Sequence, residues 1–259
     1  MGAGGFTLGL AALVSAASLS AEVYARAPRP NYAPAFPNFE LRDRKVTNLV
    51  VILHGLNGPD KYTKQIARSR RRNDARTQVV EYDYKKGLGD QLRAPYNAMR
   101  VGKYLAGEIK KQDQLLHVHI IAFSVGAFAA DCIAVEISHE ISRPRLRLTF
   151  LDPFTARSTM GLLRPHSAYG VKNFGKTVDA SGIVESVFNR DDPVPSTNLP
   201  LRHAVNFDVT SSTHRKKFFP SPGDSFHSWP AAWYSKKYKL LDIDNRSKAQ
   251  RGSTVTVLD

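Results

Sequence analysis

The stretch VHIIAFSVGAFAADCIAV, residues 118–135, places one serine between an apolar run and an alanine-rich run. The first run is short and apolar, which is typical of a buried strand, and the second is typical of a helix. Small residues stand two positions on either side of Ser124, at Ala122 and Gly126. A chain that turns sharply from strand to helix needs small residues there, because the two backbones nearly touch. The sequence therefore predicts a strand, a tight turn at Ser124 and a closely packed helix.

Similar apolar runs recur along the chain and alternate with helical patterns. Apolar runs predict strands over residues 47–55, 77–84, 115–123, 146–152, 182–189 and 204–210, and helices are expected over 94–109, 126–137 and 230–241. Strands that alternate with helices indicate an α/β fold with a mostly parallel sheet. Right-handed crossovers place helices on both faces and bring the carboxyl ends of the strands to one edge.

The chain of 259 residues, 42% of them hydrophobic, is long enough for one large core. We expect the folded domain to span residues 46–242, between a Pro-rich linker at 28–45 and a polar tail at 243–259. Residues 1–27 have an apolar stretch and a small-residue cleavage pattern, which predicts a signal or organelle-targeting segment. Cys132 is the only cysteine, so the chain cannot form an internal disulfide.

The formal net charge is +14. The basic residues are scattered and no nucleic-acid recognition motif is visible, so nucleic acid is not the partner we expect. An anionic membrane surface or an acidic substrate agrees equally well with this charge. The densest basic run, RSRRRNDAR at residues 68–76, is expected to be the exposed end of a helix.

The segment around Ser124 follows the G-x-S-x-G pattern of a nucleophile elbow, with alanine in place of the first glycine. An elbow exposes the serine hydroxyl and aims the amino end of the next helix at the reacting group, where it favours an oxyanion. A serine at this place could also be a simple helix cap. As a nucleophile it needs a base, an orienting acid and an oxyanion hole.

His227 is the expected base, because it follows the last predicted strand and precedes the last helix. The order Ser, Asp, His along the chain is that of α/β-hydrolases. The acid has three candidates: Asp152 ends the strand after the elbow unit, and Asp191 and Asp192 end the following strand. Each of these could instead be a turn residue, and the general position after the later strand favours the second pair.

The segment Leu53–Gly55, which reads LHG, follows an early strand at the place where an α/β-hydrolase has its second oxyanion donor. The backbone amides of Leu56 and Val125 are therefore the expected oxyanion hole. We expect His54 to shape this loop through hydrogen bonds rather than to transfer protons.

The region from Val46 to Tyr234 resembles the pancreatic lipase family of α/β-hydrolases. The resemblance lies in VVILHGLNG, VHIIAFSVGAFAA, RLTFLDPF and FHSWPAAWY. It implies a triad of Ser124, Asp152 and His227, with Asp152 preferred over Asp192 as the acid. The sequence departs from the family in Phe123 before the serine, in the lack of disulfides, and in the short stretch that follows the last helix.

The sequence thus predicts a serine carboxylic ester hydrolase that acts through an acyl-enzyme, without a cofactor or metal. Its substrate would be an acyl ester or lipid, such as an acylglycerol or a phospholipid. The same residues would also serve transfer of the acyl group to an alcohol other than water. The alternative hypothesis is an inactive hydrolase fold that binds a lipid or a protein partner.

Overall fold

A single parallel sheet forms the centre of the computed structural model, which describes residues 39–71, 74–138, 144–155, 173–194, 196–220, 225–243 and 250–259. Within these residues the sheet has seven strands in the order β2-β1-β3-β4-β5-β6-β7. The strands are β1 Asn48–Leu53, β2 Thr77–Tyr82, β3 His117–Phe123, β4 Arg145–Leu151, β5 Ile183–Phe188, β6 Val205–Asp208 and β7 Thr254–Thr256. All six neighbouring pairs are parallel, so the predicted α/β fold with a parallel sheet is confirmed.

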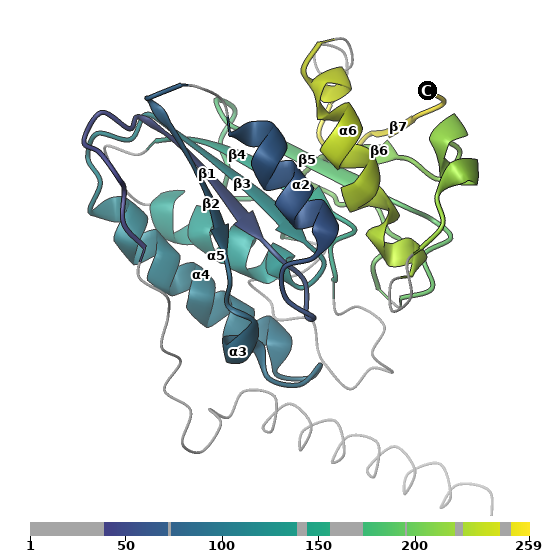
Figure 1. Ribbon diagram of the computed structural model, residues 1–259, viewed down its shortest axis with the longest axis horizontal. Helices are drawn as coiled ribbons and strands as arrows, with labels where there is room; N and C mark the ends of the chain where they lie inside the picture. Colours follow the sequence, from purple (N-terminus) through teal and green to yellow (C-terminus); the bar gives the residue numbers. More distant parts are fainter. Residues whose placement is uncertain are drawn as a thin grey trace, which may run out of the picture.

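Helices cover both faces of this sheet (Figure 1). They are α2 Lys61–Arg70, α3 Lys85–Leu88, α4 Ala94–Lys110, α5 Gly126–Ser138 and α6 Trp229–Ile243, with two 3-10 turns, η1 Thr213–Lys217 and η2 Phe226–Ser228. Helices α4 and α5 pack on one face, and α2 and α6 pack on the other. Among the described residues, no helix combines the length and the apolar character that a membrane span requires.

Strand β1 shows why the sheet needs both layers. Leu49 and Val51 enter the core beneath α4 and α5, whereas Val50 and Ile52 enter the core beneath α2 and α6. Successive side chains of a strand point to opposite faces, so a continuous apolar run is stable only when both faces are covered. This is why the uninterrupted apolar runs in the sequence correspond to central parallel strands.

The order of the strands reverses between β1 and β3, since the chain first runs outward to β2 and then crosses back. In open α/β sheets the crevice at the carboxyl ends of such strands is the usual place for a ligand. Gly55 follows β1 and Ser124 follows β3, so both lie at this switch point. The fold thus places the candidate nucleophile at the topological switch point of the sheet.

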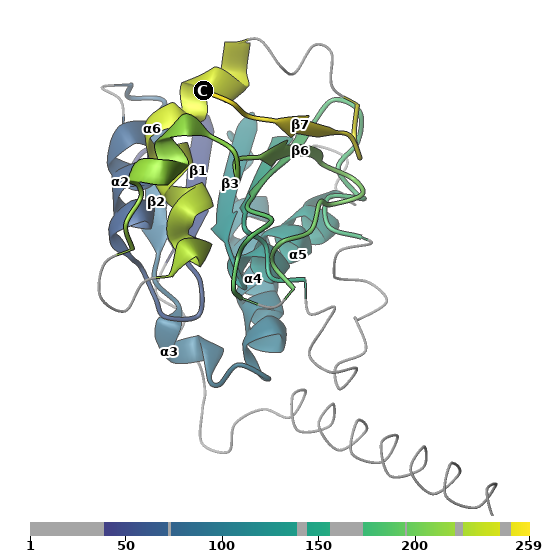
Figure 2. The same cartoon turned by 90° about the vertical axis from the view of Figure 1, so that its right-hand side faces the viewer.

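The folded unit extends beyond the expected domain limits of 46 and 242. Phe39 is buried in the core, although it belongs to the segment interpreted as a linker. Strand β7 comes from the segment interpreted as a polar tail, and it lies beside β6 at the end of the sheet (Figure 2). Residues 1–38, which include the expected targeting segment, lie outside the described residues, as do His139 and His166.

The basic run at residues 68–76 begins in the last turn of α2, which ends at Arg70. Asp60 caps the helix, since its Oδ1 accepts bonds from the amides of Tyr62 and Thr63 at 2.9 and 2.7 Å. The sequence prediction expected the end of a helix in this run but did not give its start, although Asp60 is a typical start signal. The guanidinium of Arg70 lies 3.8 Å from the ring centroid of Tyr238, so this arginine connects α2 with α6.

Candidate active site

Ser124 occupies a strained turn between β3 and α5. Its φ angle is +54°, in the left-handed region that non-glycine residues rarely adopt. Its amide donates to the carbonyl of Leu151 at 3.0 Å, and its own carbonyl accepts from the amide of Phe154 at 3.1 Å. The end of β4 thus holds the turn from both sides, and such strain is a feature of functional sites.

The small residues around the serine allow close packing, as predicted, but at Gly126 the neighbour is β1 and not the strand that precedes the serine. A Cβ atom at Gly126 would lie 2.9 Å from the carbonyl oxygen of His54 and 3.0 Å from that of Leu53. Both are backbone atoms at the end of β1, which cannot move aside easily. Ala122 is fully buried. The close approach of α5 to β1 therefore requires glycine two positions after the serine.

The loop after β1 lies against the elbow. A Cβ atom at Gly55 would be 3.2 Å from the Cβ of Ser124 and 3.2 Å from the ring of Phe123. The amides of Leu56 and Val125 have no acceptor among the described residues. Backbone amides without an acceptor are suited to bind an oxyanion, and this role of Leu56 and Val125 remains a prediction.

His54 is buried beside this loop, and both of its ring nitrogens are engaged. Nδ1 lies 2.6 Å from the carbonyl oxygen of Gly55, and Nε2 accepts a bond from the amide of Tyr84 at 3.0 Å. The pKa of His54 is lowered, mainly because burial disfavours the charged form of the ring. A neutral histidine with two bonds to backbone groups fixes the loop, as the sequence prediction expected.

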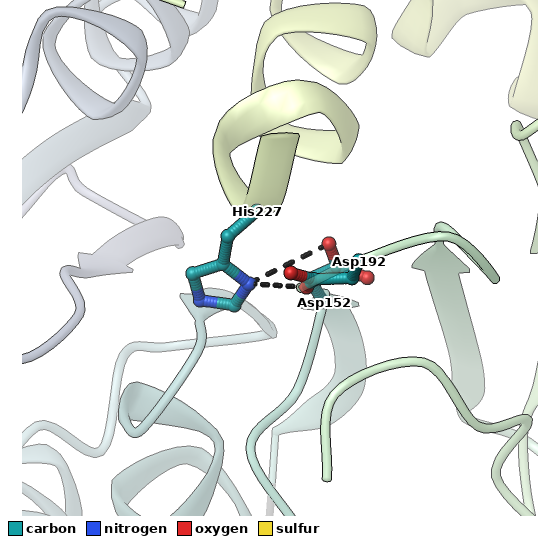
Figure 3. Close-up of side chains that lie close together, drawn as sticks. All are labelled: Asp152, Asp192 and His227. Carbon is teal, nitrogen blue, oxygen red and sulfur yellow. Dashed lines mark hydrogen bonds and ion pairs between the residues drawn. The ribbon is translucent and has the colours of Figure 1, made fainter. Parts of the chain in front are cut away.

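His227 lies beside two carboxyl groups, and Asp192 is its hydrogen-bond partner (Figure 3). His227 Nδ1 is 2.6 Å from Asp192 Oδ2 and 3.6 Å from Asp152 Oδ2. The family resemblance predicted that Asp152 would lie within hydrogen-bond distance of a ring nitrogen of His227. This prediction was wrong. The loop after β5 brings Asp192 to the ring, whereas Asp152 lies behind it at the end of β4.

Asp191 faces away from this group. Its carboxylate pairs with the guanidinium of Arg215, with nitrogen–oxygen distances of 3.1 and 3.2 Å. Its side chain is more than half exposed. Asp191 is therefore a surface ion-pair residue, and the third candidate acid does not contact His227.

Asp152 is fully buried, and only one of its oxygens has a clear donor. The amide of Asn189 donates to Oδ1 at 3.0 Å, while Oδ2 has no hydrogen-bond partner in the structure. Burial, together with the nearby charge of Asp192, raises the pKa of Asp152 well above its usual range against the opposing effect of His227. A carboxyl group in this setting is expected to keep its proton at neutral pH.

Asp192 has the opposite character. Its Oδ2 accepts a bond from the hydroxyl of Thr197 at 2.5 Å, and its Oδ1 accepts one from the amide of Val194 at 2.8 Å. Burial opposes ionisation, but the bonds and charge of His227 outweigh it and lower the pKa of Asp192. Asp192 is therefore the ionised member of the two.

His227 itself is positioned for proton transfer at its other nitrogen. Burial works to lower the pKa of His227, but bonds to and charge interactions with Asp152 and Asp192 raise it to about 9. Nε2 is buried and has no hydrogen-bond partner in the structure. The ring lies 4.8 Å, centroid to centroid, from that of Phe123, the residue before Ser124. In the neutral ring, Nε2 is thus a free acceptor on a side chain that packs against the elbow.

A metal ion fits these three side chains poorly. Asp152, Asp192 and His227 are the candidate metal ligands that lie together among the described residues, and their ligand atoms are within 4.8 Å of one another. Two ligands of a tetrahedral Zn²⁺ with bonds of about 2.0 Å lie about 3.3 Å apart. The 2.6 Å between His227 and Asp192 is instead the length of a charge-assisted hydrogen bond.

The sequence prediction missed the pairing of Asp152 with Asp192, and it missed Thr197 and Asn189 as supporting residues. The meeting of Asp152 and Asp192 could have been predicted. Strands β4 and β5 are neighbours in a parallel sheet, so the residues that follow them meet at one edge. The supporting roles of Thr197 and Asn189 could not have been predicted, because the sequence of the polar loop after β5 does not indicate which hydroxyl or amide turns inward.

The parallel sheet with its reversal of strand order, the elbow at Ser124 and a histidine before the last helix define an α/β-hydrolase fold. No family model and no curated protein sequence matches the chain. A solved structure described as a hydrolase of the α/β superfamily, from Xanthomonas campestris pv. campestris, has 14% identity and a TM-score of 0.42, and the match covers 75% of this chain and 99% of that one. RedJ, solved with a PEG molecule in its active site, has 16% identity and a TM-score of 0.33 over 67% of this chain and 81% of its own.

These likenesses are distant, and the assignment of the fold rests on the sheet topology. The resemblance to the pancreatic lipase family is finer than any of these comparisons and stays a prediction.

Proposed function

We propose that this protein is a serine hydrolase of carboxylic esters, with Ser124 as nucleophile and His227 as base. The observation that carries the proposal is the 2.6 Å bond between His227 Nδ1 and Asp192 Oδ2, on a ring that packs against Phe123, the residue before a serine at φ +54°. A bond that holds the proton on Nδ1 leaves Nε2 as the acceptor that the serine proton needs.

The proposed reaction has two halves. Ser124 Oγ attacks the acyl carbonyl while His227 Nε2 takes the hydroxyl proton, and the oxyanion lies against the amides of Leu56 and Val125. His227 then gives this proton to the leaving alcohol, and an acyl-enzyme remains on Ser124. Water hydrolyses the acyl-enzyme with His227 again as base, which releases the acid and restores the serine.

We assign the role of orienting acid to Asp192 and a supporting role to Asp152. An ionised Asp192 stabilises the imidazolium that forms on His227. A protonated Asp152, locked in place by Asn189, adds a dipole behind the pair without a second charge. Two ionised carboxylates so close together would repel each other, so one retained proton is the physically reasonable state.

The test is labelling by a fluorophosphonate, together with turnover of a short-chain nitrophenyl ester. The wild-type protein should label and turn over, and Ser124→Ala should do neither. Ser69→Ala is the matched control, since that hydroxyl bonds only within α2, to the carbonyl of Ile66 at 2.8 Å. Wild-type protein that neither labels nor turns over would favour the alternative of a binding protein with a hydrolase fold. Because no metal takes part in the proposed reaction, a chelator should leave turnover unchanged.

A further inference from the structure

A cluster of aromatic rings next to His227 holds one phenylalanine out into solvent. The ring centroid of Phe218 lies 5.2 Å from that of Trp229, 6.2 Å from that of Phe226 and 6.0 Å from that of Tyr62 in α2. Trp229 is buried, so this contact anchors Phe218. The next residue, Phe219, is 82% exposed, the highest exposure among the large apolar side chains described.

Basic side chains accompany this ring. Turn η1 ends in His214, Arg215, Lys216 and Lys217, and both lysines are exposed. The guanidinium of Arg215 lies 3.8 Å from the ring centroid of Phe226 and pairs with Asp191. The carboxylate of Asp191 is thereby balanced, so the two exposed lysines leave net positive charge on the turn that leads into Phe219.

This combination matches the interfacial region of a membrane with anionic lipids. An aromatic side chain gains from leaving water, and nearby lysines are attracted to acidic headgroups. The surface also lies beside the candidate site, because Phe226 precedes His227 in the chain and contacts Phe218. A bilayer docked here would present its ester bonds close to Ser124, whereas a nucleic acid contains no carboxylic ester.

We propose that the surface formed by Lys216, Lys217, Phe218, Phe219 and Phe226 docks on a lipid bilayer that carries anionic headgroups, with Phe219 entering the interface. The choice of a lipid over another polyanion rests on the proposed ester hydrolase function. The binding test below does not depend on turnover, so the two proposals can fail separately.

The first experiment places a local reporter at the surface. The full chain carries Ser124→Ala, which prevents hydrolysis, and Phe219→Trp. Vesicles of phosphatidylcholine with phosphatidylserine should shift its emission to the blue, and brominated acyl chains should quench it, more strongly than vesicles of phosphatidylcholine alone. The native tryptophans, Trp229 and Trp233, are buried and give the same background in the control variant described below.

Leu116→Trp is the matched control, because Leu116 is 60% exposed and lies before β3, at the opposite edge of the sheet. Its emission should not change. An unchanged emission from the Phe219→Trp protein would overturn the proposal, even if residues 1–38 hold the chain on the vesicles. A shift with a single-stranded oligonucleotide but not with vesicles would overturn it in favour of nucleic acid.

The second experiment measures partition onto the same vesicles in the Ser124→Ala background. Phe219→Ser should weaken binding by about 10-fold or more. Replacing Lys216 and Lys217 with glutamine should weaken it by about 5-fold per lysine, and added salt should reduce that difference. Lys103→Gln is the control, since that exposed lysine lies on α4, on the other face of the sheet.

With Ser124 intact, Phe219→Ser should keep turnover of a soluble nitrophenyl ester and lose turnover of a vesicle-borne ester. If vesicle binding is unaffected by all of these changes, the docking surface is wrong while the ester hydrolase proposal stands. If vesicle binding depends on these residues but no ester is turned over, the docking surface is right and the ester hydrolase proposal is wrong.

Discussion

His227 donates a 2.6 Å hydrogen bond from Nδ1 to Asp192 Oδ2, while Asp152, at 3.6 Å, lies behind the pair. The two acids come from the ends of neighbouring strands and share one histidine. Their environments differ: Asp192 accepts bonds from Thr197 and Val194, while Asp152 has a buried oxygen without a partner. Charge is therefore expected to reside on Asp192, and the consequences of this arrangement can be measured.

Removing the charge of each acid should have unequal effects. Asp192→Asn should reduce kcat by about 10⁴, the size of the effect when the triad acid of a serine protease is replaced by asparagine. Asp152→Asn should reduce it by less than about 10-fold, because a protonated carboxyl and an amide are both neutral. Nitrophenyl ester turnover measured side by side decides the matter. Near-normal turnover in Asp192→Asn, with loss in Asp152→Asn, would show that Asp152 is the orienting acid, as the family resemblance implies.

The pH dependence of kcat/KM should report the raised pKa of His227. The reaction needs neutral Nε2, and the two carboxyl groups raise the pKa of His227 to about 9. Activity should therefore rise with pH through the neutral and mildly alkaline range. In Asp192→Asn the histidine loses its stabilising charge while burial still lowers its pKa, so the acid limb should move to lower pH. The rate of fluorophosphonate labelling measures this in the slow variant, and an acid limb that stays in place would contradict the assignment.

Gly126→Ala should damage both the elbow and the stability of the fold. The added Cβ would meet two backbone carbonyls at 2.9 and 3.0 Å, which forces α5 away from β1. We expect a loss of about 1–3 kcal/mol in the free energy of unfolding, as for other overpacked sites, together with loss of turnover. Gly107→Ala is the control, because its Cβ would meet nothing within 4 Å in α4. That change should be neutral or stabilise by about 0.5–1 kcal/mol. Denaturant unfolding of both variants would show whether close packing at residue 126 matters.

Asp131 should make stability depend on pH. Its Oδ1 accepts a bond from the amide of Gly175 at 2.7 Å, and its Oδ2 is buried without a partner. Burial raises the pKa of Asp131 to about 7 from its ordinary value of 3.8. The folded state thus holds a proton that the unfolded state releases. The contribution to stability is complete below about pH 4 and is lost as pH rises through about 7.

Asp131→Asn removes this titration and can keep the bond to Gly175. The variant should gain thermal stability relative to the wild-type protein as pH rises from about 5 to about 8. Melting temperatures at several pH values provide the measurement. A difference between the two proteins that does not change with pH would show that Asp131 does not take up a proton on folding.

Some features followed from local sequence alone. The apolar run that became β1 is continuous because both of its faces are covered, and it predicted a buried strand of a parallel sheet. The small residues around Ser124 predicted a close approach of helix and strand, and Gly126 shows one, although the strand that α5 approaches there is β1. Short segments failed: β7 has three residues in a polar stretch, and the start of α2 was overlooked although Asp60 caps it.

The sequence by itself determined the alternation of the central strands with α4, α5 and α6, the position of the elbow and the place of His227 before the last helix, because each depends on residues close together in the chain. Only the tertiary structure decided which carboxylate reaches His227. The candidates differ by about an ångström in their distance from one nitrogen, 2.6 against 3.6 Å. That difference depends on how the loop after β5 closes around Thr197 and how Asn189 holds Asp152 back. Such long-range placement leaves no local pattern in the sequence, since it results from the packing of segments far apart along the chain.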